Sequence, residues 1–223
     1  QLQLQPDAVS QMFSTYAPVF TIEDSGEFDR VGMVGFTNEQ QVQVDVAQPT
    51  VYTHLAYTRF EGKTLPQLVY IAWFPARPKN GVSDLLGGRL DGIIWRVTLD
   101  DDGMPLLFDS IHPCGCYHMF FPTERLRAIA APKKYTEWAF SPKRLTQRPE
   151  DVRLNITVQT KTHYLANVAV DMEGAIGDVQ SYSLKPYNEL RSIKTAQGFV
   201  NLFGLNGIVK GSERGERFLL WPS

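Results

Sequence analysis

Residues with metal-binding or nucleophilic side chains are concentrated in one short stretch, residues 111–119. It contains both cysteines and two of the four histidines of the 223-residue chain. They follow one another as His112, Cys114, Cys116 and His118, with one residue between each. Imidazole nitrogen and thiolate sulfur suit zinc, copper or iron rather than calcium or magnesium. The stretch therefore predicts a site for a zinc or copper ion.

A hairpin would bring the two histidines of this stretch together. If residues 113–117 form its loop, His112 and His118 become directly opposed on neighbouring strands, with Cβ atoms about 4.5 to 5.5 Å apart. The glycine between the cysteines permits a bend that turns both thiols toward one point. Four ligands so close in sequence are cramped compared with zinc sites built from separated pairs. We therefore expect two or three of them to act together with His54 or His163 from another strand. A closed coordination sphere would make the metal structural, and an open water position would allow catalysis.

Other interpretations of the cysteines stay open. A Cys114–Cys116 disulfide would close a small, strained ring that is easily reduced, and buried thiols would behave as small apolar side chains. Either fits a non-catalytic β module that binds a ligand or a protein. A thiol activated by a nearby histidine would instead make a thiol-dependent enzyme. Residues 115–119 resemble the Gly-Cys-hydrophobic-Arg motif of L,D-transpeptidases, but that family's preceding histidine is missing and His118 replaces the arginine, so its roles are not transferred.

The elements that must position these residues are mostly strands. Residues 41–46 alternate polar and apolar side chains, as a half-buried strand does. Residues 68–74 form a nearly continuous apolar run, which is typical of a central strand buried on both faces. Residues 93–99 and 106–108 flank an Asp-Gly turn and predict a hairpin whose second arm leads into the cysteine stretch. We predict one mainly β domain over residues 1–223, an antiparallel sandwich or barrel-like fold with few short helices.

Three further segments have a distinct character. Residues 6–13 predict a short helix, because Pro6 suits the first turn and three apolar side chains share a face. Residues 75–88 contain Asn80-Gly81 and predict a long loop that borders a site. Residues 123–151 are rich in proline and basic side chains and predict a connection that wraps around the domain.

The composition excludes several classes of function. A net charge of −2, with 43% hydrophobic and 21% charged residues, gives no field that would favour nucleic acid or a membrane surface. No run approaches the roughly 18 apolar residues of a membrane-spanning helix. Motifs of zinc proteases, serine hydrolases, phosphate-binding loops and dinucleotide-binding folds are absent from the sequence. Whether the chain is an enzyme stays open.

The two ends of the chain carry further expectations. The sequence begins at Gln1 rather than Met, so we expect either a removed targeting segment or an internal start. Residues 216–223 end in an apolar run, so we expect that the chain continues or that a further polypeptide segment completes this edge. Residues 112–121 and 211–217 resemble uncharacterised exported bacterial proteins. That resemblance implies a periplasmic or extracellular location and no particular activity.

Overall fold

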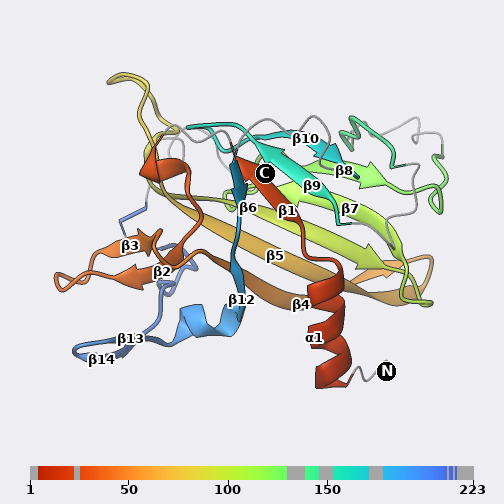
Figure 1. Cartoon of the computed structure of the whole chain (residues 1–223), viewed down its shortest axis with the longest axis horizontal. Coiled ribbons are helices and arrows are strands. Elements are labelled where there is room, and N and C mark those ends of the chain that lie inside the picture. The colour runs from red at the N-terminus through yellow and green to blue at the C-terminus, as the bar shows by residue number, and fades with distance from the viewer. Residues whose placement is uncertain are drawn as a thin grey trace.

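The larger of two main sheets has six strands in the order β12-β4-β5-β6-β7-β8 (Figure 1). The computed structural model describes residues 5–22, 26–129, 139–145, 153–170, 178–209, 211–212 and 214. The six strands are β12 (Ser183–Pro186), β4 (Thr50–Phe60), β5 (Lys63–Arg77), β6 (Gly88–Leu99), β7 (Pro105–Ile111) and β8 (Met119–Pro122).

Successive hairpins build this sheet from β4 to β8, and all four pairs are antiparallel. The turn between β4 and β5 uses Glu61 and Gly62, both with positive φ. The turn between β6 and β7 uses Gly103, with φ of 82°, because glycine reaches this conformation without a steric penalty. The hairpin of β6 and β7 confirms the sequence prediction for residues 93–99 and 106–108, and β5 is the buried central strand expected over residues 68–74.

A smaller sheet packs on one face of the larger one and has the order β10-β9-β1-β11. Strand β1 of this sheet runs parallel to β9 and antiparallel to β11. The two sheets share one apolar core, which confirms a mainly β fold and gives it two layers (Figure 1). The strands are β10 (Leu165–Ala169), β9 (Asn155–Val158), β1 (Val19–Ile22) and β11 (Asp178–Gln180). Large, fully buried side chains of this core include Phe20, Ile22, Tyr70, Phe74, Trp95 and Ile156.

The opposite face of the larger sheet is also covered, by a second apolar cluster. Tyr52, Ile71 and Trp73 of the sheet pack there against Val34 and Leu190. The covering elements lie below and to the left of the sheet in Figure 1. They are β2 (Met33–Phe36), β3 (Val42–Asp45), the 3-10 helix η2 (Tyr187–Arg191), β13 (Ile193–Thr195) and β14 (Gly198–Val200).

One α-helix, α1 (Pro6–Thr15), precedes the first strand. Phe13 joins the main core, and its carbonyl accepts a hydrogen bond of 2.9 Å from the Tyr70 hydroxyl. The helix predicted over residues 6–13 is therefore confirmed and is two residues longer. A short 3-10 turn, η1 (Glu27–Asp29), follows β1. No helix among the described residues is long and apolar enough to cross a membrane.

The proline-rich connection is described in two pieces, residues 123–129 and 139–145. The second piece lies beside β8, with bridges from Met119 to Phe140 and from Thr123 to Leu145. The remainder of the predicted connection, like residues 215–223 at the C-terminal end, lies outside the described residues.

Three loops meet at one end of the sandwich: residues 78–87 after β5, residues 112–118 after β7 and residues 159–164 after β9. The first projects at the upper left of Figure 1, beside the turn from β9 to β10. Hydrogen bonds join Arg77, the last residue of β5, to Tyr164, and His112 to His163.

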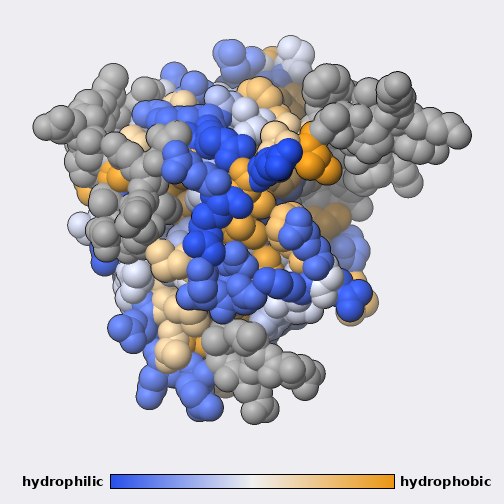
Figure 2. Space-filling view, turned by 90° about the vertical axis from the view of Figure 1, so that its right-hand side faces the viewer, coloured by the Kyte–Doolittle hydropathy of each residue, from blue (hydrophilic) through white to orange (hydrophobic). Residues whose placement is uncertain are grey.

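The end on the right of Figure 1 presents a mainly hydrophilic surface with smaller apolar areas between (Figure 2).

Candidate ligand-binding site

The predicted metal stretch forms a compact turn between β7 and β8. The N–H of His112 donates to the Cys116 carbonyl at 3.0 Å, and the N–H of Gly115 donates back to the His112 carbonyl at 2.8 Å. Gly115 has φ of 89° and Tyr117 has φ of 55°. Cys114 is exposed, Cys116 is half-buried, and neither forms a disulfide. The disulfide interpretation is therefore not met in this structure, and neither thiol is fully buried.

His112 and His118 are not opposed across the hairpin, so that expectation was wrong. The last paired residues of β7 and β8 before the turn are Ser110 and Met119. Beyond them, the N–H of His112 binds the Cys116 carbonyl. His112 is buried, and its Nε2 donates to the His163 carbonyl at 3.0 Å.

His118 belongs to a different group of side chains. Its Nε2 lies 3.0 Å from the Asp109 carboxylate and 2.8 Å from the Arg96 guanidinium, and its ring lies 4.1 Å from that of Phe120. The fourth histidine, His54, is exposed on β4 beside Tyr187. In the part of the chain that the structure describes, no three His, Cys, Asp or Glu side chains are grouped so as to hold a metal ion.

His163 lies at the centre of a buried ion cluster. Its Nδ1 donates to Asp91 at 2.8 Å, and its Nε2 lies 3.2 Å from Asp29, too poorly aligned for a hydrogen bond. The Arg214 guanidinium lies 3.3 Å from the other Asp91 oxygen. The imidazole stacks on the Phe74 ring with centroids 4.0 Å apart. Two carboxylates thus face an imidazolium and a guanidinium, which balances the buried charge.

The pKa values in the cluster favour its charged form. Burial alone would lower the pKa of His163, but the adjacent carboxylates of Asp29 and Asp91 outweigh it and raise that pKa. Burial would raise the pKa of Asp91, but His163 and Arg214 outweigh it and lower that pKa. Burial lowers the pKa of His112, which keeps this second histidine neutral.

The cluster anchors the turn between β9 and β10. The Thr160 hydroxyl and the Lys161 N–H each donate to Asp29 at 2.7 Å. Lys161 and His163 have positive φ, of 63° and 53°, a conformation that non-glycine residues adopt at a cost. In this turn His163 is buried while Lys161 is exposed on the surface.

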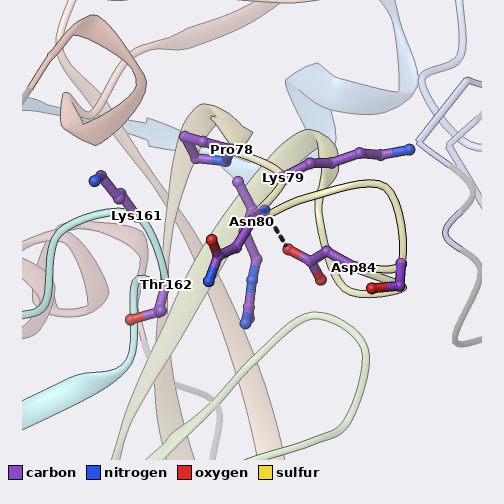
Figure 3. Close-up of a pocket in the computed structure, with 8 residues that line it drawn as sticks. Pro78, Lys79, Asn80, Asp84, Lys161 and Thr162 are labelled. Atoms are coloured by element: carbon purple, nitrogen blue, oxygen red, sulfur yellow. Dashed lines mark hydrogen bonds between the residues drawn. The ribbon is translucent and has the colours of Figure 1, made fainter.

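A polar cavity of about 530 Å³ opens above this turn. Figure 3 shows Asn80 between Asp84 and the turn that carries Lys161 and Thr162. The cavity is lined by Arg77, Pro78, Lys79, Asn80, Ser83, Asp84, Lys161 and Thr162.

Asp84, the one carboxylate among the described residues of the cavity wall, binds groups of the loop itself. Asp84 accepts hydrogen bonds from the backbone N–H groups of Asn80, Leu86 and Gly87, at 2.8, 2.9 and 3.2 Å. These backbone donors lower the pKa of Asp84. The lining thus includes three cationic residues, Arg77, Lys79 and Lys161, and one carboxylate that is already bound, so its net charge is positive.

Arg77 is held in place by a pair of tyrosines. Its guanidinium donates to the Tyr164 hydroxyl at 3.1 Å and lies 4.9 Å from the centroid of that ring. The Tyr164 hydroxyl donates in turn to the hydroxyl of Tyr117, whose pKa this contact raises to about 12. Tyr117 follows the cysteines, so the predicted metal turn is connected to the cavity through the two tyrosines.

Of the sequence-predicted histidines, the structure brings His112 and His163 together, whereas His118 contacts Asp109 and Arg96 and His54 lies beside Tyr187. Sequence reasoning missed Asp29 and Asp91, because each is a single acid on a different segment. It did single out the Asn80-Gly81 loop as the border of a site, and that loop forms one wall of the cavity.

Comparison with protein-family models and with curated proteins gave no match. Among solved structures, the chain is similar to NLPPya in complex with mannosamine, with a TM-score of 0.45 and 12% identity over 90% of this chain and 87% of that one. It is also similar to a structure described as a toxin fold for microbial attack and plant defense, with a TM-score of 0.45 and 14% identity over 92% of this chain and 89% of that one.

Proposed function

We propose that the chain is a non-catalytic ligand-binding β protein that holds an anionic small molecule in the cavity beside the 78–87 loop. The observation that carries the proposal is the net positive charge of the cavity lining, which includes Arg77, Lys79 and Lys161 and one carboxylate, Asp84, that backbone donors already occupy. A carboxylate, sulfate or phosphate group supplies the acceptors that these donors lack.

The geometry supports binding more than catalysis. None of the described residues that line the cavity is a histidine or a cysteine. Arg77 is oriented by Tyr164 before any ligand arrives, which reduces the entropy lost on binding. Its planar guanidinium suits a bidentate contact with a carboxylate or phosphate.

Binding of inorganic phosphate, sulfate and acetate, measured by isothermal titration calorimetry at low salt, tests the proposal. We expect phosphate to bind and its affinity to fall as salt is added. Lys161→Ala removes one cation whose side chain is exposed, and we expect about tenfold weaker binding, since charge-assisted hydrogen bonds contribute about 1.5 kcal/mol or more.

The matched control is Lys194→Ala, which removes an exposed lysine on β13 outside the cavity. We expect its phosphate affinity to equal that of the wild type. Failure of all three anions to bind, or equal losses in both variants, would contradict the proposal.

Zinc or copper binding at residues 111–119 stays a prediction, as does a periplasmic or extracellular location. Two of the predicted ligands already have partners, since the His112 ring is bound to the His163 carbonyl and His118 to Asp109.

A further inference from the structure

The cavity wall contains an asparagine followed by glycine, Asn80-Gly81, on the projecting 78–87 loop. In such a dipeptide the glycine amide nitrogen can attack the asparagine side-chain carbonyl, because glycine has no Cβ to obstruct the approach. The reaction requires that both groups be free to move toward each other. A folded protein prevents it by holding either group in a hydrogen bond.

Both reacting groups of Asn80-Gly81 are unengaged. Within the described ranges, the Asn80 side-chain amide and the Gly81 N–H make no hydrogen bond to any other residue. Both residues are exposed, Gly81 has φ of 91°, and no atom lies within 4 Å of the position that a Cβ would take there. The Asn80 backbone N–H is fixed by Asp84 at 2.8 Å (Figure 3), so the backbone is held while the side chain is left free.

The same dipeptide occurs once more, at Asn206-Gly207, and there both groups are occupied. The Asn206 side-chain oxygen accepts a hydrogen bond from the Ile208 N–H at 3.1 Å. The Gly207 N–H donates to the Gly204 carbonyl at 2.9 Å. This second pair is exposed as well. The chain thus contains an internal control that differs in hydrogen bonding and not in exposure.

We propose that Asn80 is a site of spontaneous deamidation that converts one wall of the cavity from neutral to negative. The Gly81 nitrogen attacks Cγ of Asn80, a C–N bond forms, and the bond from Cγ to Nδ2 breaks as ammonia leaves with the displaced proton. Water then opens the five-membered imide. Opening at Cγ gives aspartate, and opening at the main-chain carbonyl gives isoaspartate.

The consequence for binding rests on the proposed anion site, whereas the modification itself does not. A carboxylate at position 80 adds a second negative charge to the wall that contains Asp84, and it offsets part of the positive charge of Arg77 and Lys161. Repulsion between this carboxylate and an anion bound in the cavity is expected to weaken binding roughly tenfold. The isoaspartate form also lengthens the main chain at position 80, next to the hydrogen bond from the residue 80 N–H to Asp84.

Peptide mapping by mass spectrometry after incubation of the full chain at mildly alkaline pH tests the modification. We expect aspartate and isoaspartate to accumulate at position 80 while position 206 changes far more slowly, and the two rates to converge in urea. Equal rates at the two positions in the folded chain, or reaction at position 206 first, would overturn the proposal. Asn80→Gln should abolish the change at position 80 and leave position 206 unaffected.

Phosphate titration of Asn80→Asp tests the consequence separately. We expect roughly tenfold weaker binding than in the wild type. Unchanged affinity would overturn the effect on the cavity. If the wild type itself binds no phosphate, the proposed function fails, while the mass measurement still decides whether Asn80 deamidates.

Discussion

At the scale of single residues, His163 has the largest number of roles. Its imidazole is fully buried between Asp29 and Asp91, and its carbonyl accepts a hydrogen bond from His112. Removing one partner from a buried ion pair leaves an uncompensated charge, which costs about 3 to 5 kcal/mol. The histidine is therefore expected to matter for stability, and through the Lys161 turn for the shape of the cavity.

The ion cluster predicts how stability depends on pH. Because the pKa of His163 is raised on folding, its contribution is complete below the unfolded value of about 6.5 and is lost as the pH rises through the higher folded value. Because the pKa of Asp91 is lowered, its contribution is present above about 3.9 and is lost as the pH falls.

Urea unfolding over a pH series measures this dependence. We expect the difference in free energy of unfolding between the wild type and His163→Asn to shrink as the pH rises above neutral. A difference that stays constant from weakly acidic to alkaline pH would show that His163 is not charged in the folded protein.

At the scale of elements, the turn between β7 and β8 shows what the sequence could and could not predict. The hairpin itself was predictable, since β-rich runs and turn residues are local signals. Its register was not, because it depends on Gly115 and Tyr117 taking positive φ, and tyrosine gives no sequence signal for that conformation. A small change of register moves a side chain to the other face, which separates His112 from His118.

The buried cluster was unpredictable for a different reason. Asp29, Asp91 and His163 come from η1, β6 and the turn after β9. No pattern within any one of these segments indicates the other two. Their meeting depends on how the two sheets pack, which periodicity does not specify.

Gly115 allows a direct test of the turn. A Cβ at this position would meet no atom within 4 Å, so Gly115→Ala reports the backbone conformation alone and should lower the free energy of unfolding by about 1 kcal/mol. Gly35 on β2 has equally open space without a positive φ, and Gly35→Ala should be neutral or stabilise by about 0.5 kcal/mol. Chemical denaturation of both variants gives the comparison, and equal effects would contradict the described turn.

The two thiols of the same turn permit a test of the metal prediction. Elemental analysis of protein purified without added metal should find zinc or copper near one equivalent if the prediction holds, and Cys114→Ser with Cys116→Ser should remove it. Without metal, a thiol titration should find both cysteines reactive, and Cys114 faster, because it is the more exposed. Metal retained by the double variant would contradict thiol ligation.

At the scale of the whole molecule, the larger sheet is buried on both faces by different parts of the chain. The second face is covered partly by residues from the C-terminal third, of which Leu190 is fully buried. Leu190→Ala should lower the free energy of unfolding by about 2 to 5 kcal/mol. Leu205→Ala, at a fully exposed position nearby in sequence, should change it by less than about 0.5 kcal/mol. Denaturant unfolding distinguishes them, and similar small effects would mean that this covering is not structural.

The position of β1 has a consequence for how the protein is made. This strand is synthesised before the larger sheet, yet its partners β9 and β11 follow that sheet in the sequence. Its edges therefore stay unpaired while strands β4 to β8 are translated, and the smaller sheet closes only after β9 and β11 have been made. Such non-local pairing slows folding and prolongs the exposure of apolar strand edges. Slower elongation or a chaperone that shields nascent strands is thus expected to raise the yield of folded protein.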